Sequence, residues 1–337
     1  MTKLKIWLPI TLVVIVAVIT ATFFIGSGDK KNAEPNKEVE KEKGREGAAI
    51  IWEVKSETAT VYIIGAVHVG KQDMHPMPQA LLDAFYDSDI IAFEVISEPF
   101  GAELEEYMNE QIRYNDGTTI KDHVSLEIYE MLQEYIGSFP DEVPEDWHLY
   151  KPIFLAGEIS YDYSTIDLQT LSELMTVDRS LGVEGYFEPL AYKYQKEVLA
   201  IEGDKYKFDM ELNYSPALQE YFLKESLQNA LYGNSNDIIE EFRYNSRLLD
   251  LWRDGDAEGI RDYSIEEVQM EIEAMGGLFE EYYNVMITQR NNNMVKMVID
   301  MLDGNKNVFF APGVFHVVGE NGILDQLKDM GYTVTRL

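Results

Sequence analysis

Two of the five histidines occur in the same short motif near opposite ends of the chain. Gly65-Ala-Val-His68 follows the apolar run 59–64, and Gly313-Val-Phe-His316 follows the apolar run 307–311. Such runs are typical of buried strands, and in an open α/β sheet ligands bind beyond the carboxyl ends of the strands. A glycine there permits a tight turn and a close approach to a ligand. A single histidine in this position is more often structural, but the matched pair predicts imidazoles that can coordinate a metal ion.

Two glutamates also stand at the ends of apolar runs. Glu94 follows the run 90–93 and Glu202 follows the run 198–201, where a buried strand cannot carry an unpaired charge. One interpretation is that both are strand-end residues in solvent. The functional hypothesis is that Glu94 completes a metal site with His68 and His316, a set of two histidines and one carboxylate that leaves positions open for water and substrate.

Three further residues are candidates for catalysis with such a metal. A divalent metal ion lowers the pKa of its bound water, and a nearby carboxylate, Glu202 or the weaker candidate Glu184, would act as the base. Arg290, in Thr288-Gln-Arg-Asn291, could orient a carboxylate or stabilise developing negative charge. An isolated Arg-Asn pair on an amphipathic helix is otherwise expected at the surface.

The composition limits the chemistry. Because the chain has no Cys, thiol nucleophiles, Cys-ligated zinc and iron-sulfur clusters are excluded, and a metal site must use His, Asp, Glu and water. Mn, Co and Zn all remain compatible with that set. The net charge of -32 opposes binding to nucleic acid. The motifs typical of zincins, α/β-hydrolases, P-loop enzymes and Rossmann dehydrogenases do not occur.

The candidate residues need a sheet to bring them together. The N-terminal part reads as a hairpin over 50–54 and 59–64, a helix over 79–86 and a strand over 90–95. The C-terminal part repeats the order strand, loop, helix, strand, over 307–311, 322–330 and 332–337, which suggests a weak internal duplication in one sheet. Short strands are expected at 180–183 and 197–201, and 210–302 has helical periodicity. The prediction is an α/β fold with a mixed central sheet built from both ends and a large helical insertion.

The first residues predict a membrane anchor. Residues 6–25 contain no charge, and twenty apolar residues span a bilayer. Lys3 and Lys5 precede the span, which orients the rest of the chain outward. We therefore expect an anchor over 1–25, a disordered charged linker over 26–46 and an extracytoplasmic domain over 47–337 of a single-pass cell-membrane protein. The alternative for 1–25 is a cleaved signal peptide.

A set of motifs in fixed order resembles the TraB/PrgY/GumN family, which is related to the Tiki membrane metalloproteases. The resemblance covers about residue 50 to the C-terminus. The motifs are Trp52-Glu-Val, Val61-Tyr-Ile-Ile-Gly-Ala-Val-His-Val-Gly70, Phe93-Glu94, Gly182-Val-Glu184, Ala200-Ile-Glu202, Trp252-Arg-Asp-Gly-Asp256, Arg290-Asn291 and Pro312-Gly-Val-Phe-His-Val-Val-Gly-Glu-Asn-Gly322.

The resemblance implies a metal site made from the paired Gly-x-x-His motifs and a glutamate, and an α/β core related to erythromycin esterase and ChaN-like proteins. Because Tiki proteins are Mn- or Co-dependent proteases, the resemblance also implies metal-dependent proteolysis. Carried to this sequence, His68, Glu94 and His316 become the metal ligands, with Glu202 and Arg290 as supporting residues.

Three functions follow as hypotheses. The leading one is an outward-facing, membrane-anchored metallohydrolase, a peptidase acting on a peptide or protein substrate. The alternative is a non-catalytic protein that binds and sequesters a secreted, pheromone-like peptide in the same pocket. An esterase acting on a small molecule is a third, which only analogy at the level of the fold supports.

Overall fold

The computed structural model describes residues 41–94, 96, 101–140, 143–159, 176–233 and 235–337. The predicted anchor (1–25) and most of the predicted linker (26–46) lie outside the described residues. Within the described ranges, no helix is long and apolar enough to cross a membrane. The last linker residues contact the domain, because the backbone N–H of Glu42 donates to the Tyr86 hydroxyl (2.8 Å) and that of Gly44 to Gln79 Oε1 (2.8 Å).

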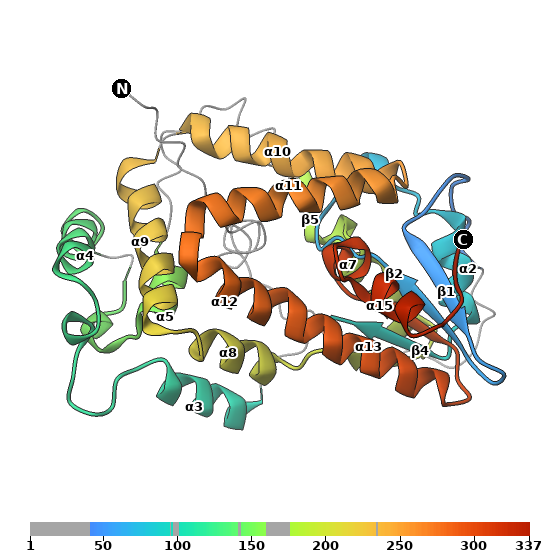
Figure 1. Cartoon of the computed structure of the whole chain (residues 1–337), viewed down its shortest axis with the longest axis horizontal. Coiled ribbons are helices and arrows are strands. Elements are labelled where there is room, and N and C mark those ends of the chain that lie inside the picture. The colour runs from blue at the N-terminus through green and yellow to red at the C-terminus, as the bar shows by residue number, and fades with distance from the viewer. Residues whose placement is uncertain (1–40, 95, 97–100, 141–142, 160–175, 234) are drawn as a thin grey trace.

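A six-stranded mixed sheet lies toward one end of the molecule (Figure 1), with the strand order β6-β4-β7-β2-β1-β8. Its strands are β1 (Ile51–Lys55), β2 (Thr60–Ile64), β4 (Ile90–Phe93), β6 (Glu197–Ala200), β7 (Val308–Ala311) and β8 (Val334–Arg336). β1 pairs antiparallel with β2 and β8, and β2, β7, β4 and β6 are parallel neighbours. The predicted hairpin and the predicted sheet shared by both ends of the chain are therefore confirmed.

The position of each strand explains its sequence. The central strand β7 has neighbours on both sides, and its four residues Val-Phe-Phe-Ala are all buried. The edge strand β6 reads Glu-Val-Leu-Ala and alternates between exposed and partly buried residues. A strand covered on both faces is continuously apolar, whereas an edge strand can carry charge, so the two patterns follow from place in the sheet.

Helices cover both faces of the sheet. On one face, α2 (Gln79–Asp87) and α7 (Val183–Lys193) place Phe85 and Phe187 against Phe309 of β7, with ring centroids 6.2 and 5.0 Å away. On the other, α13 (Gln289–Leu302) contacts β2 and α15 (Ile323–Asp329), and both lie in front of the sheet in Figure 1.

The connections create a crevice at the carboxyl ends of β2 and β7. β2 leads through α2 to β4 on one side, while β7 leads through α14 (Val314–Val318) and α15 to β8 on the other. Because crossovers between parallel strands are right-handed, connections that run in opposite directions lie on opposite faces. Neighbouring parallel strands whose connections lie on opposite faces leave a crevice beyond their carboxyl ends, and ligands bind in this crevice in α/β sheets. Both Gly-x-x-His motifs begin there.

The predicted helical insertion occupies most of the chain between β4 and β7. Besides α7 and α13, its helices in the described part include α3 (Ala102–Gln111), α4 (Leu126–Ser138), α5 (Pro152–Glu158), α8 (Asp204–Leu212), α9 (Pro216–Tyr232), α10 (Ser235–Arg253), α11 (Ala257–Met275) and α12 (Phe279–Tyr283). In Figure 1, α4, α5 and α9 form the end far from the sheet, with their own apolar cluster around Leu132, Leu155 and Leu227. α10 leads back to the sheet, and α11 begins there and contacts α14, so the insertion also covers the crevice (Figure 1).

One predicted strand is wrong. Residues 180–183 form the 3-10 turn η5 (Arg179–Leu181) and the start of α7, and only the short β5 (Val177–Asp178) pairs there, with β3 (Gly70–Lys71). The reason is close packing of the backbone against the first Gly-x-x-His motif. The N–H of Val183 donates to the carbonyl of Val67 (2.9 Å), and a Cβ on Gly182 would lie 2.6 Å from the His68 carbonyl carbon.

Candidate functional site

The first motif places His68 at the wall of the crevice. β2 ends at Ile64, and Gly65 is required because a Cβ there would lie 2.6 Å from Ile50 Cγ2. His68 Nδ1 is 2.8 Å from Oε1 of Glu184, the second residue of α7. Since a carboxylate accepts, Nδ1 is the protonated nitrogen of this contact, and Nε2 is the nitrogen left for a ligand.

The second motif holds His316 in a matching way. His316 lies in α14, is 5% exposed, and its Nδ1 is 2.7 Å from Oδ1 of Asn291 on α13. Asn291 is itself fixed, because its Nδ2 donates to the carbonyl of Asn321 (3.3 Å). The amide oxygen accepts from Nδ1, so in the neutral imidazole of His316 the Nε2 atom carries no proton.

Glu94 lies between them in a buried cluster of charges. Its Oε1 accepts from Arg290 Nη2 (2.6 Å) and Lys207 Nζ (2.9 Å), and its Oε2 accepts from the backbone N–H of Gly313 (2.8 Å). Arg290 Nε and Nη2 also donate to the Glu202 carboxylate (2.8 and 2.7 Å). Burial opposes ionisation, but Lys207 and Arg290 more than offset it, so the pKa of Glu94 is well below its usual range.

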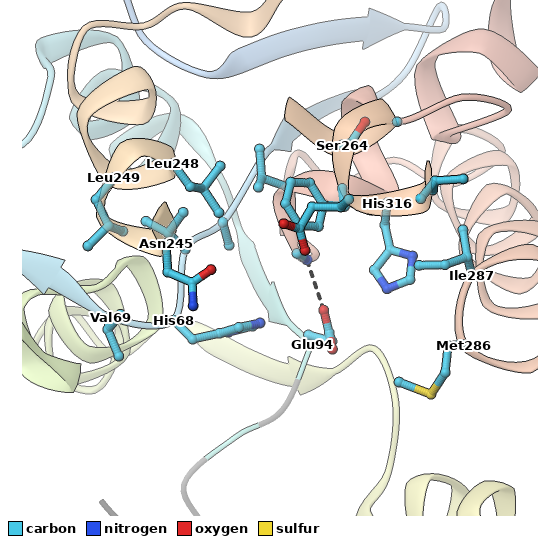
Figure 2. A pocket seen from close by; sticks show the side chains of 18 of the residues that line it. His68, Val69, Glu94, Asn245, Leu248, Leu249, Ser264, Met286, Ile287 and His316 are labelled. Atoms are coloured by element: carbon cyan, nitrogen blue, oxygen red, sulfur yellow. Dashed lines mark hydrogen bonds between the residues drawn. The ribbon is translucent and has the colours of Figure 1, made fainter. Parts of the chain in front are cut away.

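Gly313 is the point at which the three predicted ligands converge. A methyl group built on it would lie 3.1 Å from Glu94 Oε2, 3.6 Å from His316 Cδ2 and 3.7 Å from His68 Nε2. Figure 2 shows the rings of His68 and His316 on either side of Glu94. A side chain here would contact all three residues and crowd Glu94, so the glycine leaves space at the centre of the site.

These residues line a cavity of about 190 Å³. Its walls are mainly apolar and come from the first motif, from α10 and α11 of the insertion, and from the π-helix η7 (Asn284–Thr288) that precedes α13. Figure 2 shows Val69, Leu248, Leu249, Met286 and Ile287 around the polar centre. The cavity suits a largely apolar ligand with polar groups directed at the Glu94 side.

The two imidazoles have opposite tendencies to hold a proton. Burial disfavours the charged form of both. For His68, the charge and the hydrogen bond of Glu184 outweigh burial and raise the pKa to about 9. For His316, burial and the charge of Arg290 lower the pKa to about 3. With no metal bound, His68 is therefore an imidazolium at neutral pH and His316 a neutral imidazole, so a metal ion would have to displace the Nε2 proton of His68.

The donor set fits a metal ion in part. Ligand histidines in metal sites donate their other N–H to a carboxylate or carbonyl, as both do here. Against this, both oxygens of Glu94 already accept hydrogen bonds from the protein. In the described part of the chain, no three or more His, Asp or Glu side chains are arranged to hold an ion. A metal ion would bind after Glu94 exchanges one of these hydrogen bonds.

Several expectations are corrected or extended by the structure. Arg290 and Asn291 are not at the surface, since they are 3% and 1% exposed, and Glu94 and Glu202 are buried rather than in solvent. The structure adds two residues with no predicted role, Asn291 as the partner of His316 and Lys207 as a partner of Glu94. The adjacency of Asn291 to Arg290 could have suggested the first, but no sequence signal marks Lys207.

The predicted site residues divide into two groups. His68, Glu94, His316 and Arg290 line the cavity. Glu184 and Glu202 contact it through His68 and Arg290 respectively.

Comparison with known proteins gives one match. No curated protein sequence and no solved structure matches the chain. The family model described as the TraB/PrgY/gumN family matches residues 50–336, which span the sheet, the helical insertion and both histidine motifs. The match covers well over half of the chain, and the chain belongs to the TraB/PrgY/gumN family.

Proposed function

We propose that the cavity is the active site of a metal-dependent hydrolase that cleaves peptides outside the cell, with the chain held at the membrane by residues 1–25. The convergence of His68, Glu94 and His316 on Gly313, with both Nδ1 atoms already held by protein partners, is the observation that carries the proposal. A bound divalent ion, Mn, Co or Zn, would polarise the scissile carbonyl and acidify water.

Each residue then has a defined task. His68 and His316 would hold the ion through Nε2, and Glu94 would supply the carboxylate ligand. Glu184 and Asn291 hold the imidazole rings in the required tautomer. Arg290 lines the cavity and fixes Glu94, and it would stabilise negative charge that develops on the substrate. Glu202 is fully engaged by Arg290, which favours a positioning role for it over a role as base.

The alternative, a protein that binds a peptide without cleaving it, is favoured by a different observation. Both Glu94 oxygens have protein donors, so the charge cluster is complete without an ion. The mainly apolar cavity would then hold a peptide side chain, and the cluster would act as part of its rigid wall.

Metal content and peptide cleavage, measured on the full chain, separate the two. The chain would be analysed for metals as purified and after reconstitution with Mn, Co or Zn, and incubated with a mixture of synthetic peptides that is followed by mass spectrometry. We expect about one ion per chain and cleavage that stops on chelation. Peptide binding with no ion after reconstitution would contradict the hydrolase and support the binding protein.

A second test concerns the outer support of His316. Asn291→Leu removes the acceptor of the Nδ1 proton, and loss of such a support typically weakens metal affinity about 10- to 100-fold. We expect that loss in a metal titration. Asn292→Leu, one residue further along α13 and exposed, is the matched control and should bind the ion as the wild type does. Equal affinities in the two variants would exclude this role for Asn291.

A further inference from the structure

A second polar feature lies in the same cavity, on the wall formed by α11. Glu267 and Glu271 are one helical turn apart and therefore lie on the same face of this helix. Both line the cavity, and both are more than nine-tenths buried, with exposed fractions of 5% and 8%. Two carboxylates rarely share so enclosed a position without a cation, because burial strongly disfavours their charge.

The two carboxylates differ in their partners. Glu267 lies close enough to the hydroxyls of Tyr244 and Tyr263 to act on them electrostatically, while the Tyr263 hydroxyl donates to Oδ1 of Asn245 (3.1 Å). Glu271, by contrast, has no hydrogen-bond donor and no cationic partner among the described residues. Burial and the negative charge of Glu267 raise the pKa of Glu271 to about 8. A buried acceptor that faces a cavity and has no donor from the protein lacks a group that a ligand can supply.

Two arginines, Arg179 and Arg290, line the cavity, but neither acts on the charge of Glu271, whose pKa reflects only burial and Glu267. Tyr282, on the cavity wall, is within electrostatic reach of both Glu271 and Arg290, so the two lie on neighbouring parts of the cavity. Arg290, however, donates to Glu94 and Glu202 at 2.6 to 3.1 Å and is not available to Glu271. The cavity thus has a polar centre at Glu94 and a separate carboxyl group on α11, which a cationic ligand would ionise, with apolar wall between and around them.

We propose that Glu271, supported by Glu267, is a subsite that receives a primary ammonium group of the ligand while apolar parts of the ligand fill the rest of the cavity. The ammonium donates charge-assisted hydrogen bonds to Glu271 and supplies the counter-charge that the protein itself lacks. This inference rests on the proposed function, because it names the substrates of the same cavity as peptides that carry a free amino end or a lysine side chain.

The first experiment uses hexylamine and hexanol, which differ mainly in the charged head group, and measures their binding to the full chain by calorimetry in the presence of a chelator. We expect the wild type to bind hexylamine at least about tenfold more tightly than hexanol. Glu271→Gln should remove this preference. Glu273→Gln changes an exposed carboxylate of the same helix and should retain it. Equal binding of the two probes to the wild type, or an unchanged preference in Glu271→Gln, would overturn the proposal.

A second set of ligands identifies the source of the ammonium. One apolar tetrapeptide is compared with its amino-acetylated form, and an acetylated peptide with one lysine is compared with the same peptide carrying norleucine. A preference for the free amino end assigns the subsite to the start of a peptide, and a preference for lysine assigns it to a side chain. No preference in either pair would contradict the subsite.

The outcomes also separate this inference from the proposed function. If the chain prefers amines but shows no metal-dependent cleavage, the hydrolase proposal would be wrong and the ammonium subsite would still be supported. The reverse result is metal-dependent cleavage at equal rates for free and acetylated peptides and for the lysine and norleucine peptides. It would contradict the ammonium subsite and support the hydrolase. If Glu271→Gln lowered kcat equally for charged and neutral peptides without changing KM, Glu271 would act on the reaction instead of on the ammonium, which would likewise overturn the subsite.

Discussion

Replacing Arg290 with methionine is expected to destabilise the fold by about 3–5 kcal/mol, the cost of breaking a buried ion pair by removing one partner. Arg290 is 3% exposed and bridges Glu94 and Glu202, which are themselves buried. Methionine fills similar space but removes every hydrogen bond from Arg290 to Glu202 and leaves this carboxylate with only the longer ion pair to Lys207 Nζ (4.0 Å). Urea unfolding followed by circular dichroism measures the change.

Two companion variants make the result specific to the buried cluster. Arg290→Met combined with Glu202→Gln should recover part of the lost stability, because the double variant no longer buries the Glu202 carboxylate without its arginine partner. Lys306→Met removes one partner of an exposed ion pair, Lys306–Glu197, and should change the unfolding transition little, since water screens that pair. If Arg290→Met unfolded at the same urea concentration as Lys306→Met, the buried cluster would not be ionised as described.

The largest functional loss is expected from His68→Ala and His316→Ala. Under the proposed function, each removes one nitrogen ligand and should lower metal content from about one ion per chain to almost none. Peptide cleavage should fall by more than about a hundredfold, because loss of a group that merely supports a ligand already costs 10- to 100-fold. Elemental analysis and mass spectrometry of the peptide products measure the two effects.

The matched control is His148→Ala. His148 is exposed in the 3-10 turn η3 (Trp147–Leu149) of the helical insertion and does not line the cavity. This variant should keep both the ion and the activity, and thermal unfolding of all three variants shows whether they are folded. Full metal occupancy in both cavity variants would rule out the two histidines as ligands, whatever their effect on cleavage.

The central residues of the site could be predicted because their signals are local. His68, Glu94 and His316 each follow a short apolar run, and the carboxyl ends of neighbouring parallel strands meet at one edge of a sheet. The sequence therefore indicated which side chains come together before the strand order was known. The predicted strand at 180–183 is instead a turn and the start of a helix, because a short apolar run does not distinguish a strand from a buried turn.

Burial and partnership on the helices could not be predicted in the same way. Arg290 contacts Glu202 across 88 residues of sequence and Glu94 across 196, so no local pattern records either contact. Asn291 is next to Arg290 in the chain but points to His316, because successive residues on a helix face directions about 100° apart. Only the packing of α13 beside α14 and β2 makes both side chains part of the site.

The mixed sheet, its hairpin, the helical insertion and the three residues around Gly313 could be read from periodicity and from the residues that follow apolar runs, and the family could be read from motifs in fixed order. The tertiary structure alone decided how charge is distributed around them: that both oxygens of Glu94 are bonded, that His68 is held by Glu184 and His316 by Asn291, and that Glu271 faces the cavity without a donor. The physical reason is that ionisation and hydrogen bonding depend on distances between groups that are remote in sequence, which only the folded chain fixes.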